Sequence, residues 1–181
     1  MAHADVLFDS FAGPDGGFIT STGWSVNSGQ IMDQAFTIGS TTTLSSIDIA
    51  MFGSTNDLIT LTVHADNAGT PGTTIEMLSF NLTSDSASIY SVNSIANSVL
   101  TAGTYHVTIE GTGFDAWSFN NANNNGDMLF STDQGATWNA FNNTAGAIRI
   151  NGSGVVPEPA SLAVLGLGAL ALVRRKKFHS A

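Results

Sequence analysis

Apolar and polar residues alternate along three long stretches of the chain. Between Thr43 and Phe52 the apolar positions are Leu44, Ile47, Ile49 and Met51, with one break in the alternation at Ser45-Ser46 that a β-bulge would explain. The same period of two recurs as Ile59, Leu61, Val63 and Ala65, and again as Tyr105, Val107 and Ile109. Threonine fills many of the intervening positions. This alternation predicts antiparallel strands with one buried face and one solvent-facing face.

Shorter apolar segments between turn clusters predict further strands. They cover residues 6–8, 24–26, 35–38, 75–82, 89–92, 117–119, 128–131, 137–141 and 147–150. The turn clusters are rich in Gly, Pro, Asn and Asp, at residues 13–17, 53–57, 66–72, 102–103 and 120–127. No convincing helical period precedes Ala160. We therefore expect one all-β domain over residues 5–152, an antiparallel β-sandwich of jelly-roll or Greek-key type.

The C-terminal part of the sequence has a different pattern. A linker at residues 153–159 contains Pro157-Glu158-Pro159, residues 160–173 form an apolar run, and Arg174-Arg175-Lys176-Lys177 follow. A helix over 160–173 would be roughly 21 Å long, which is short of the ~30 Å hydrocarbon core of a bilayer. It can span if the basic residues extend into the headgroups. We predict a C-terminal hydrophobic transmembrane helix, although a buried helix of a soluble domain and a plain one-pass anchor remain as alternatives.

The basic residues predict the orientation of this helix. Lys and Arg stay on the cytoplasmic side of a membrane, so residues 174–181 are expected to be a basic cytoplasmic tail and the sandwich to face the other side. Glu158 would be costly at the bilayer centre, at about 2.5 kcal/mol or more, and is expected at the interface.

These three ordered features resemble a PEP-CTERM sorting signal. Pro157, Glu158 and Pro159 correspond to the motif, residues 162–173 to the short membrane segment, and Arg174, Arg175, Lys176 and Lys177 to the stop-transfer block. In that family an exosortase, a membrane transpeptidase-like enzyme, cuts near the tripeptide and passes the protein to the cell surface. The resemblance implies a bacterial surface protein, commonly in organisms that make exopolysaccharide, and implies no activity for the sandwich.

The sandwich itself is strongly acidic. Before residue 157 the chain holds one arginine, no lysine and thirteen acidic residues, a formal charge of −12. Such a surface repels phosphate, so neither nucleic acid nor an anionic lipid surface is an expected partner. The chain contains no cysteine, which excludes disulfides and thiolate metal sites.

The first residues resemble the end of a signal peptide. Ala2-His3-Ala4 has the small-x-small form of a signal peptidase site, but no basic and apolar segment precedes it. We interpret residues 1–4 as the remnant of a cleavage region. A short leader with accidental alanines is the alternative.

Two internal motifs favour a sandwich with defined turns. Ser131, Asp133, Gly135 and Trp138 fit the Asp-box pattern S-x-D-x-G-x-x-W, in which the carboxylate accepts backbone amides, the glycine takes positive φ and the indole packs under the hairpin. Several copies occur in sialidase-like β-propellers, but one copy marks a hairpin. No second carboxylate is placed for glycosidase chemistry.

The second motif is the segment 100–105, which predicts a tyrosine corner with Tyr105 bonded back to nearby backbone. With the segment 63–72 and the region 8–36, it resembles the choice-of-anchor domains that often precede sorting tails. The body is therefore expected to resemble a choice-of-anchor β-sandwich.

The histidines and the Asn-rich turn are candidate metal ligands. His64 and His106 lie singly on the polar faces of predicted strands, so we expect exposed side chains and no metal site. The run Asn120–Asp127 offers oxygen donors beside a glycine, and calcium binding there is possible in so acidic a body. Asn-rich turns more often bond their own backbone, and we expect no other cofactor.

Aromatic side chains leave a sugar-binding function open. Trp24, Tyr90, Trp117 and Trp138 can stack on sugar rings, but Trp117 alternates with Phe119 and the hairpin accounts for Trp138, so core packing explains most of them. Motifs for nucleophilic, phosphoryl-transfer and zinc-protease chemistry do not occur. The sequence thus predicts a non-enzymatic exported protein of the cell surface or extracellular matrix, processed by an exosortase. The alternative is a carbohydrate-binding module associated with exopolysaccharide and biofilm.

Overall fold

The computed structural model describes residues 4–11, 17–122 and 125–154, and the regular elements in these ranges are strands. In chain order they are β1 (Ala4–Asp9), β2 (Phe18–Val26), β3 (Ile31–Ile38), β4 (Thr42–Phe52), β5 (Leu58–Asp66), β6 (Pro71–Asn81), β7 (Ser88–Asn93), β8 (Val99–Leu100), β9 (Gly103–Gly111), β10 (Asp115–Asn120), β11 (Asn125–Ser131), β12 (Asn139–Thr144) and β13 (Ile148–Gly154). The predicted C-terminal helix at 160–173 lies outside the described residues.

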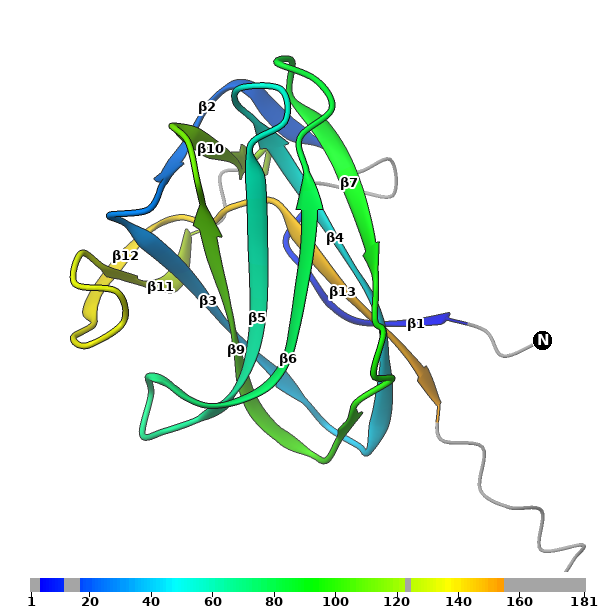
Figure 1. Ribbon diagram of the computed structural model, residues 1–181. Helices are drawn as coiled ribbons and strands as arrows, with labels where there is room; N and C mark the ends of the chain where they lie inside the picture. Colours follow the sequence, from blue (N-terminus) through cyan, green and yellow to red (C-terminus); the bar gives the residue numbers. More distant parts are fainter. Residues whose placement is uncertain (1–3, 12–16, 123–124, 155–181) are drawn as a thin grey trace, which may run out of the picture.

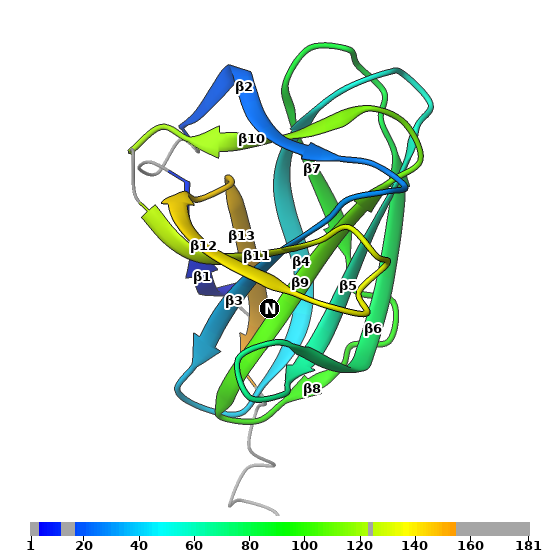
Figure 2. The same ribbon diagram turned by 90° about the vertical axis from the view of Figure 1, so that its left-hand side faces the viewer.

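The strands form two antiparallel sheets that pack face to face, as Figures 1 and 2 show. One sheet has the order β12-β11-β3-β9-β5-β6. The other has the order β1-β13-β4-β10-β2, with β7 and β8 also paired to β4. An all-β architecture of two antiparallel sheets confirms the predicted fold class, while the jelly-roll or Greek-key topology stays a prediction.

The core lies between the sheets and is built by the alternating residues. Ile47 and Ile49 from β4 and Leu61 from β5 are fully buried, and they belong to one hydrophobic cluster that draws on both sheets. The break that the pattern showed at Ser45-Ser46 is a bulge, since Asn151 pairs with Ser46 and the next residue of β13 pairs with Leu44. The two-residue period therefore predicted the facing of β4 and its irregularity.

The tyrosine corner is also confirmed. The Tyr105 hydroxyl donates to the Thr101 carbonyl at 2.8 Å, just before β9 enters the six-stranded sheet.

The limits of two strands differ from the prediction. Strand β2 begins at Phe18 and β6 at Pro71, both earlier than their apolar cores, because edge strands can continue through polar residues without burying them.

Glu76 joins the edges of the two sheets. It lies on β6 opposite Val63, is 6% exposed, and accepts hydrogen bonds from the Ile95 amide at 2.8 Å and the Ala96 amide at 3.0 Å. The Ser94 hydroxyl donates to the same carboxylate at 2.9 Å. Burial raises the pKa of Glu76, but the hydrogen bonds from the loop after β7 outweigh burial and hold the pKa below its ordinary value.

Replacing Glu76 with alanine is expected to lower the free energy of unfolding by about 2 to 3 kcal/mol at pH 7, since it removes the charged acceptor of the hydrogen bonds from the Ile95 and Ala96 amides and the Ser94 hydroxyl. Because the pKa of Glu76 is lower in the folded protein than in the unfolded chain, the ionised carboxylate stabilises the fold at pH values above its ordinary pKa of 4.5. This contribution disappears as the pH falls through the folded-state pKa. Urea unfolding at pH 7 and pH 3 measures both effects. If the wild type and the Glu76→Ala protein differed in free energy of unfolding by the same amount at both pH values, this role of the carboxylate would be contradicted.

Candidate functional site

The outer face of the six-stranded sheet carries a hollow of about 270 Å³, which we call the outer-face groove. Its floor comes from neighbouring strands, with Thr62 and His64 on β5 and Thr108 and Glu110 on β9. Its rim includes Pro71 and Met77 of β6 and Gln134 and Trp138 of the β11–β12 connection. The groove thus combines hydroxyl, amide, imidazole and carboxylate groups with one indole ring.

The Asp-box residues form the connection that holds Trp138 at the rim. The Ser131 hydroxyl donates to Asp133 Oδ1 at 2.8 Å and accepts the Gly135 amide at 2.8 Å. The Thr137 amide donates to the same Asp133 oxygen at 2.9 Å. The hydrogen bonds to Asp133 lower its pKa to about 2, and the bond from the Thr137 hydroxyl has the largest effect.

Positive backbone dihedral angles complete this tight connection. Gln134 has φ 58° and Gly135 has φ 84°. Trp138 is half-buried beside Gly135 and follows the turn, so it belongs to the connection and not to β12, where the sequence placed it. The indole therefore lies at the groove and not in the interior of the sandwich.

The floor histidine is hydrogen-bonded through both ring nitrogens. His64 Nδ1 lies 3.1 Å from the Gly72 carbonyl, and its Nε2 lies 3.1 Å from the Thr108 hydroxyl. Because a carbonyl can only accept, Nδ1 carries a proton, while the Thr108 hydroxyl also lies 3.5 Å from the Thr62 carbonyl as a donor. Burial lowers the pKa of His64 and favours the uncharged ring.

His106 lies next to His64 on the same face, but the expectation that it is exposed was wrong. Its side chain is 1% exposed, with Nδ1 2.7 Å from Asp33 Oδ2 and Nε2 3.0 Å from Asp66 Oδ1. Burial lowers the pKa of His106, but the two carboxylates outweigh burial and raise it. Both ring nitrogens are occupied, so this ion triad connects β3, β9 and the end of β5 and offers no nitrogen to a substrate.

The other candidate stacking residues have structural partners. Trp117 is fully buried and donates to the Ala147 carbonyl at 3.0 Å. Trp24 packs on Phe141 with ring centroids 4.8 Å apart, and Tyr90 stacks on Phe80 at 4.9 Å. Of the four predicted candidates, Trp138 is the residue that lines the outer-face groove.

The Asn-rich run is split between two strands. Asn120 is buried at the end of β10 and donates to the Ala145 carbonyl, whereas Asp127 on β11 accepts from Asn142. Residues 123–124 lie outside the described ranges. Within the described ranges no three His, Cys, Asp or Glu side chains gather as a metal site. Calcium binding at this run stays a prediction.

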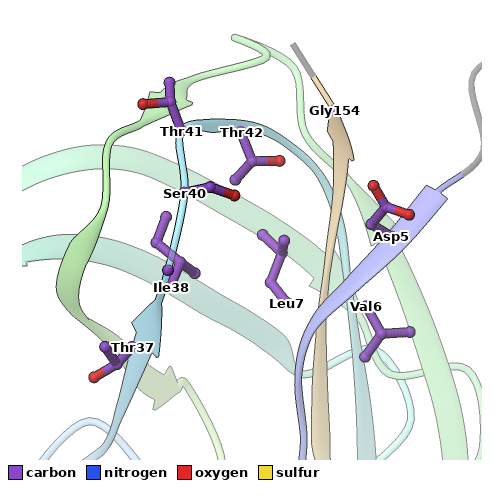
Figure 3. A pocket seen from close by; sticks show the side chains of 10 residues that line it. Asp5, Val6, Leu7, Thr37, Ile38, Ser40, Thr41, Thr42 and Gly154 are labelled. Carbon is purple, nitrogen blue, oxygen red and sulfur yellow. The ribbon is translucent and has the colours of Figure 1, made fainter. Parts of the chain in front are cut away.

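A second hollow, of about 290 Å³, lies at the Gly154 end of β13. Figure 3 shows the Leu7 side chain of β1 between Gly154 and the Ser40–Thr42 turn that joins β3 to β4. In sequence, the residues that follow Gly154 are those of the C-terminal segment with Pro157-Glu158-Pro159.

Comparison with known protein families identifies this C-terminal segment. Residues 155–177 match the family model of the PEP-CTERM protein-sorting motif. The chain carries a PEP-CTERM sorting motif. This signal implies export with transient membrane anchoring and processing by an exosortase. Curated proteins gave no match to the chain.

The matched range contains the predicted sorting residues but lies outside the part of the chain that the structure describes. It includes Pro157, Glu158 and Pro159, the apolar run, and the basic block Arg174–Lys177. Among the described residues, no helix is long and apolar enough to cross a membrane.

Proposed function

We propose that this chain is a non-enzymatic protein of the cell surface or extracellular matrix, delivered there by its PEP-CTERM signal. The observation that carries the proposal is the match of residues 155–177 to the sorting motif, directly after the last strand of the sandwich. Pro157-Glu158-Pro159 is the segment presented to the exosortase, the run 160–173 holds it at the membrane, and the bases from Arg174 stop translocation.

The sandwich supports a role without catalysis. Both ring nitrogens of His106 and both of His64 are already hydrogen-bonded within the protein, so neither histidine is poised for proton transfer. An acidic body with a single arginine remains soluble in a hydrated polysaccharide layer. We divide the chain accordingly into a remnant at 1–4, the sandwich at 5–152, a linker at 153–159, the membrane helix at 160–173 and the tail at 174–181.

The test is the intact mass and the C-terminal peptide of the protein from the envelope and medium of its native host. We expect the chain to end near Pro157, with the run from Ala160 onward removed. A control with Pro157, Glu158 and Pro159 all replaced by alanine should keep its full C-terminus and stay with the membrane. A wild-type chain that still ends at Ala181 would contradict exosortase sorting and leave an anchored sandwich.

A second candidate function is carbohydrate binding in the outer-face groove. The specific observation is the placement of the Trp138 indole beside Gln134, Glu110 and several threonine hydroxyls. An aromatic ring packs on the apolar face of a sugar while amides, hydroxyls and carboxylates bond its hydroxyl groups. Because the body carries a formal charge of −12, the groove favours neutral polysaccharides over acidic ones.

Replacing Trp138 with alanine is expected to weaken glycan binding about tenfold, as loss of an aromatic platform does. Affinity electrophoresis in gels that contain a soluble β-glucan, a galactomannan or alginate measures the retardation. We expect a neutral glycan to retard the wild type and alginate to have no effect. Phe114→Ala is the matched control, because Phe114 is 89% exposed and does not line the groove. Equal retardation of the Trp138 variant would exclude this groove.

A further inference from the structure

A third hollow opens at the flank of the sandwich where the last strands of the two sheets meet. Strand β2 ends the order of the seven-stranded sheet, β12 ends that of the six-stranded sheet, and β2 lies above β11 and β12 in Figures 1 and 2. The hollow has a volume of about 230 Å³ and is lined by Trp24, Gln30, Met32, Phe130 and Phe141. We call it the flank hollow. It shares none of these residues with the outer-face groove and is therefore a separate site.

Aromatic rings at steep angles to each other form most of the wall of this hollow. The ring centroids of Trp24 and Phe141 lie 4.8 Å apart with planes inclined by 72°, and those of Phe130 and Phe141 lie 5.7 Å apart with planes inclined by 67°. The Trp24 indole also donates to the Thr144 carbonyl at 2.8 Å and packs edge-on against Phe119 at 5.0 Å. The rings are therefore held in place before a ligand binds, which lowers the cost of ordering them.

The flank hollow presents few polar side-chain groups to a ligand. Its polar side chain is that of Gln30, whose amide nitrogen donates to the Ser25 carbonyl at 2.9 Å, while Met32 adds a polarisable sulfur. A primary ammonium group needs acceptors for its three N–H donors when it leaves water, whereas a quaternary ammonium group has no N–H donor to satisfy. The faces of aromatic rings attract such a cation. The lining therefore suits a quaternary ammonium group.

The charge of the body favours a cation over an anion in this hollow. Before residue 157 the formal charge is −12, and the single arginine, Arg149, is already paired with Asp9 at 2.9 Å. No lysine precedes residue 157, so the body has no lysine ammonium group of its own for the aromatic walls. Asp127 lies opposite Asn142, the neighbour of Phe141 on β12, which places a carboxylate in the same hairpin. The field of such a body repels negatively charged ligands.

We propose that Trp24, Phe130 and Phe141 form an aromatic cage that binds the quaternary ammonium group of a choline-like ligand. The cation contacts the ring faces, where its attraction to the aromatic quadrupoles replaces part of its hydration. The hollow is smaller than the sites of drug-sized ligands, so we expect it to take the ammonium group alone, with an affinity in the millimolar range. This function is independent of glycan binding in the outer-face groove.

The test is saturation-transfer NMR of small ligands with the full-length chain at pH 7. Choline is compared with 3,3-dimethylbutanol, which has its shape without the charge, and with ethanolamine, which has an ammonium charge without the methyl groups. We expect choline to bind with a Kd of about 1 mM and each of the other two at least about tenfold more weakly. Glycerophosphocholine distinguishes two sources of the group. Binding as tight as that of choline assigns the cage to lipid headgroups, weaker binding assigns it to a soluble ammonium compound, and both results support the cage.

Phe141→Leu locates the cage, because it keeps an apolar side chain and removes one ring. We expect it to weaken choline binding about fivefold or more. Phe80→Leu is the matched control, since Phe80 is also half-buried against the main core cluster but stacks on Tyr90 and does not line the hollow. The proposal is wrong if choline gives no signal, if 3,3-dimethylbutanol binds as tightly as choline, or if a folded Phe141→Leu protein binds choline like the wild type. The comparison of ligands needs no variant, so it decides the matter even where Phe141→Leu does not fold.

Discussion

Asp33→Ala is expected to lower the free energy of unfolding by about 3 to 5 kcal/mol at pH 6, the usual cost of removing one partner from a buried ion pair. Asp33 is fully buried, and its Oδ2 lies 2.7 Å from Nδ1 of His106, which is itself 1% exposed. The substitution leaves a positively charged ring in the sheet with Asp66 as its one remaining carboxylate in this triad. Urea unfolding measures the loss.

The control for this substitution is Asp127→Ala on β11, where the side chain is exposed and the expected change is below about 1 kcal/mol. Asp33→Asn keeps the shape of the side chain and separates the loss of charge from the loss of volume. Equal effects of the Asp33 and Asp127 substitutions would show that the triad does not stabilise the sheet.

The same triad sets the pH dependence of stability. The pKa of His106 is raised in the fold, so its contribution is complete below the ordinary value of 6.5 and is lost as the pH rises through the folded-state pKa. Asp66, whose pKa is lowered chiefly by its bond to His106, contributes above 3.8 and loses this contribution in acid. We therefore expect the contribution of the triad to stability to fall from pH 6 to pH 9. A His106→Gln protein should lack this fall, and an unchanged slope would contradict the assignment.

Trp117→Ala is expected to lower the free energy of unfolding by about 3 to 5 kcal/mol, because it opens a cavity between the sheets. Trp117 is fully buried in the main core cluster and donates to the Ala147 carbonyl. Its ring also lies against Gly146 so closely that a Cβ atom there would overlap it. Gly146→Ala should therefore destabilise the fold as well, by about 1 to 3 kcal/mol.

Trp138→Ala is the matched tryptophan control for Trp117. Its side chain is half-buried at the rim of the outer-face groove, so we expect a loss of about 1 kcal/mol or less. Urea unfolding followed by far-UV circular dichroism compares all three proteins without relying on tryptophan fluorescence. Similar losses for the two tryptophan variants would mean that Trp117 does not anchor the core.

Much of the fold could be predicted from local pattern. The alternation at Leu44–Met51 predicted the buried face of β4, the break at Ser45-Ser46 predicted its bulge, and Tyr105 predicted the corner before β9. These features depend on residues close together in the chain. The sorting motif was likewise readable from residues 157–159 and 174–177 alone, and the family match covers them.

The candidate sites could not be predicted in this way. Alternation placed His106 on the outer face, but whether that face is covered depends on Asp33 and Asp66, which come from other strands.

The sequence by itself determined the all-β class, the inward residues of the long strands, the acidic body and the sorting signal, because each depends on local order and composition. The tertiary structure alone decided that Trp138 lines a groove and that Asp33 and Asp66 cover His106. Those outcomes depend on strand pairing and sheet packing between distant segments, so side chains that look equivalent along the chain differ in burial and charge.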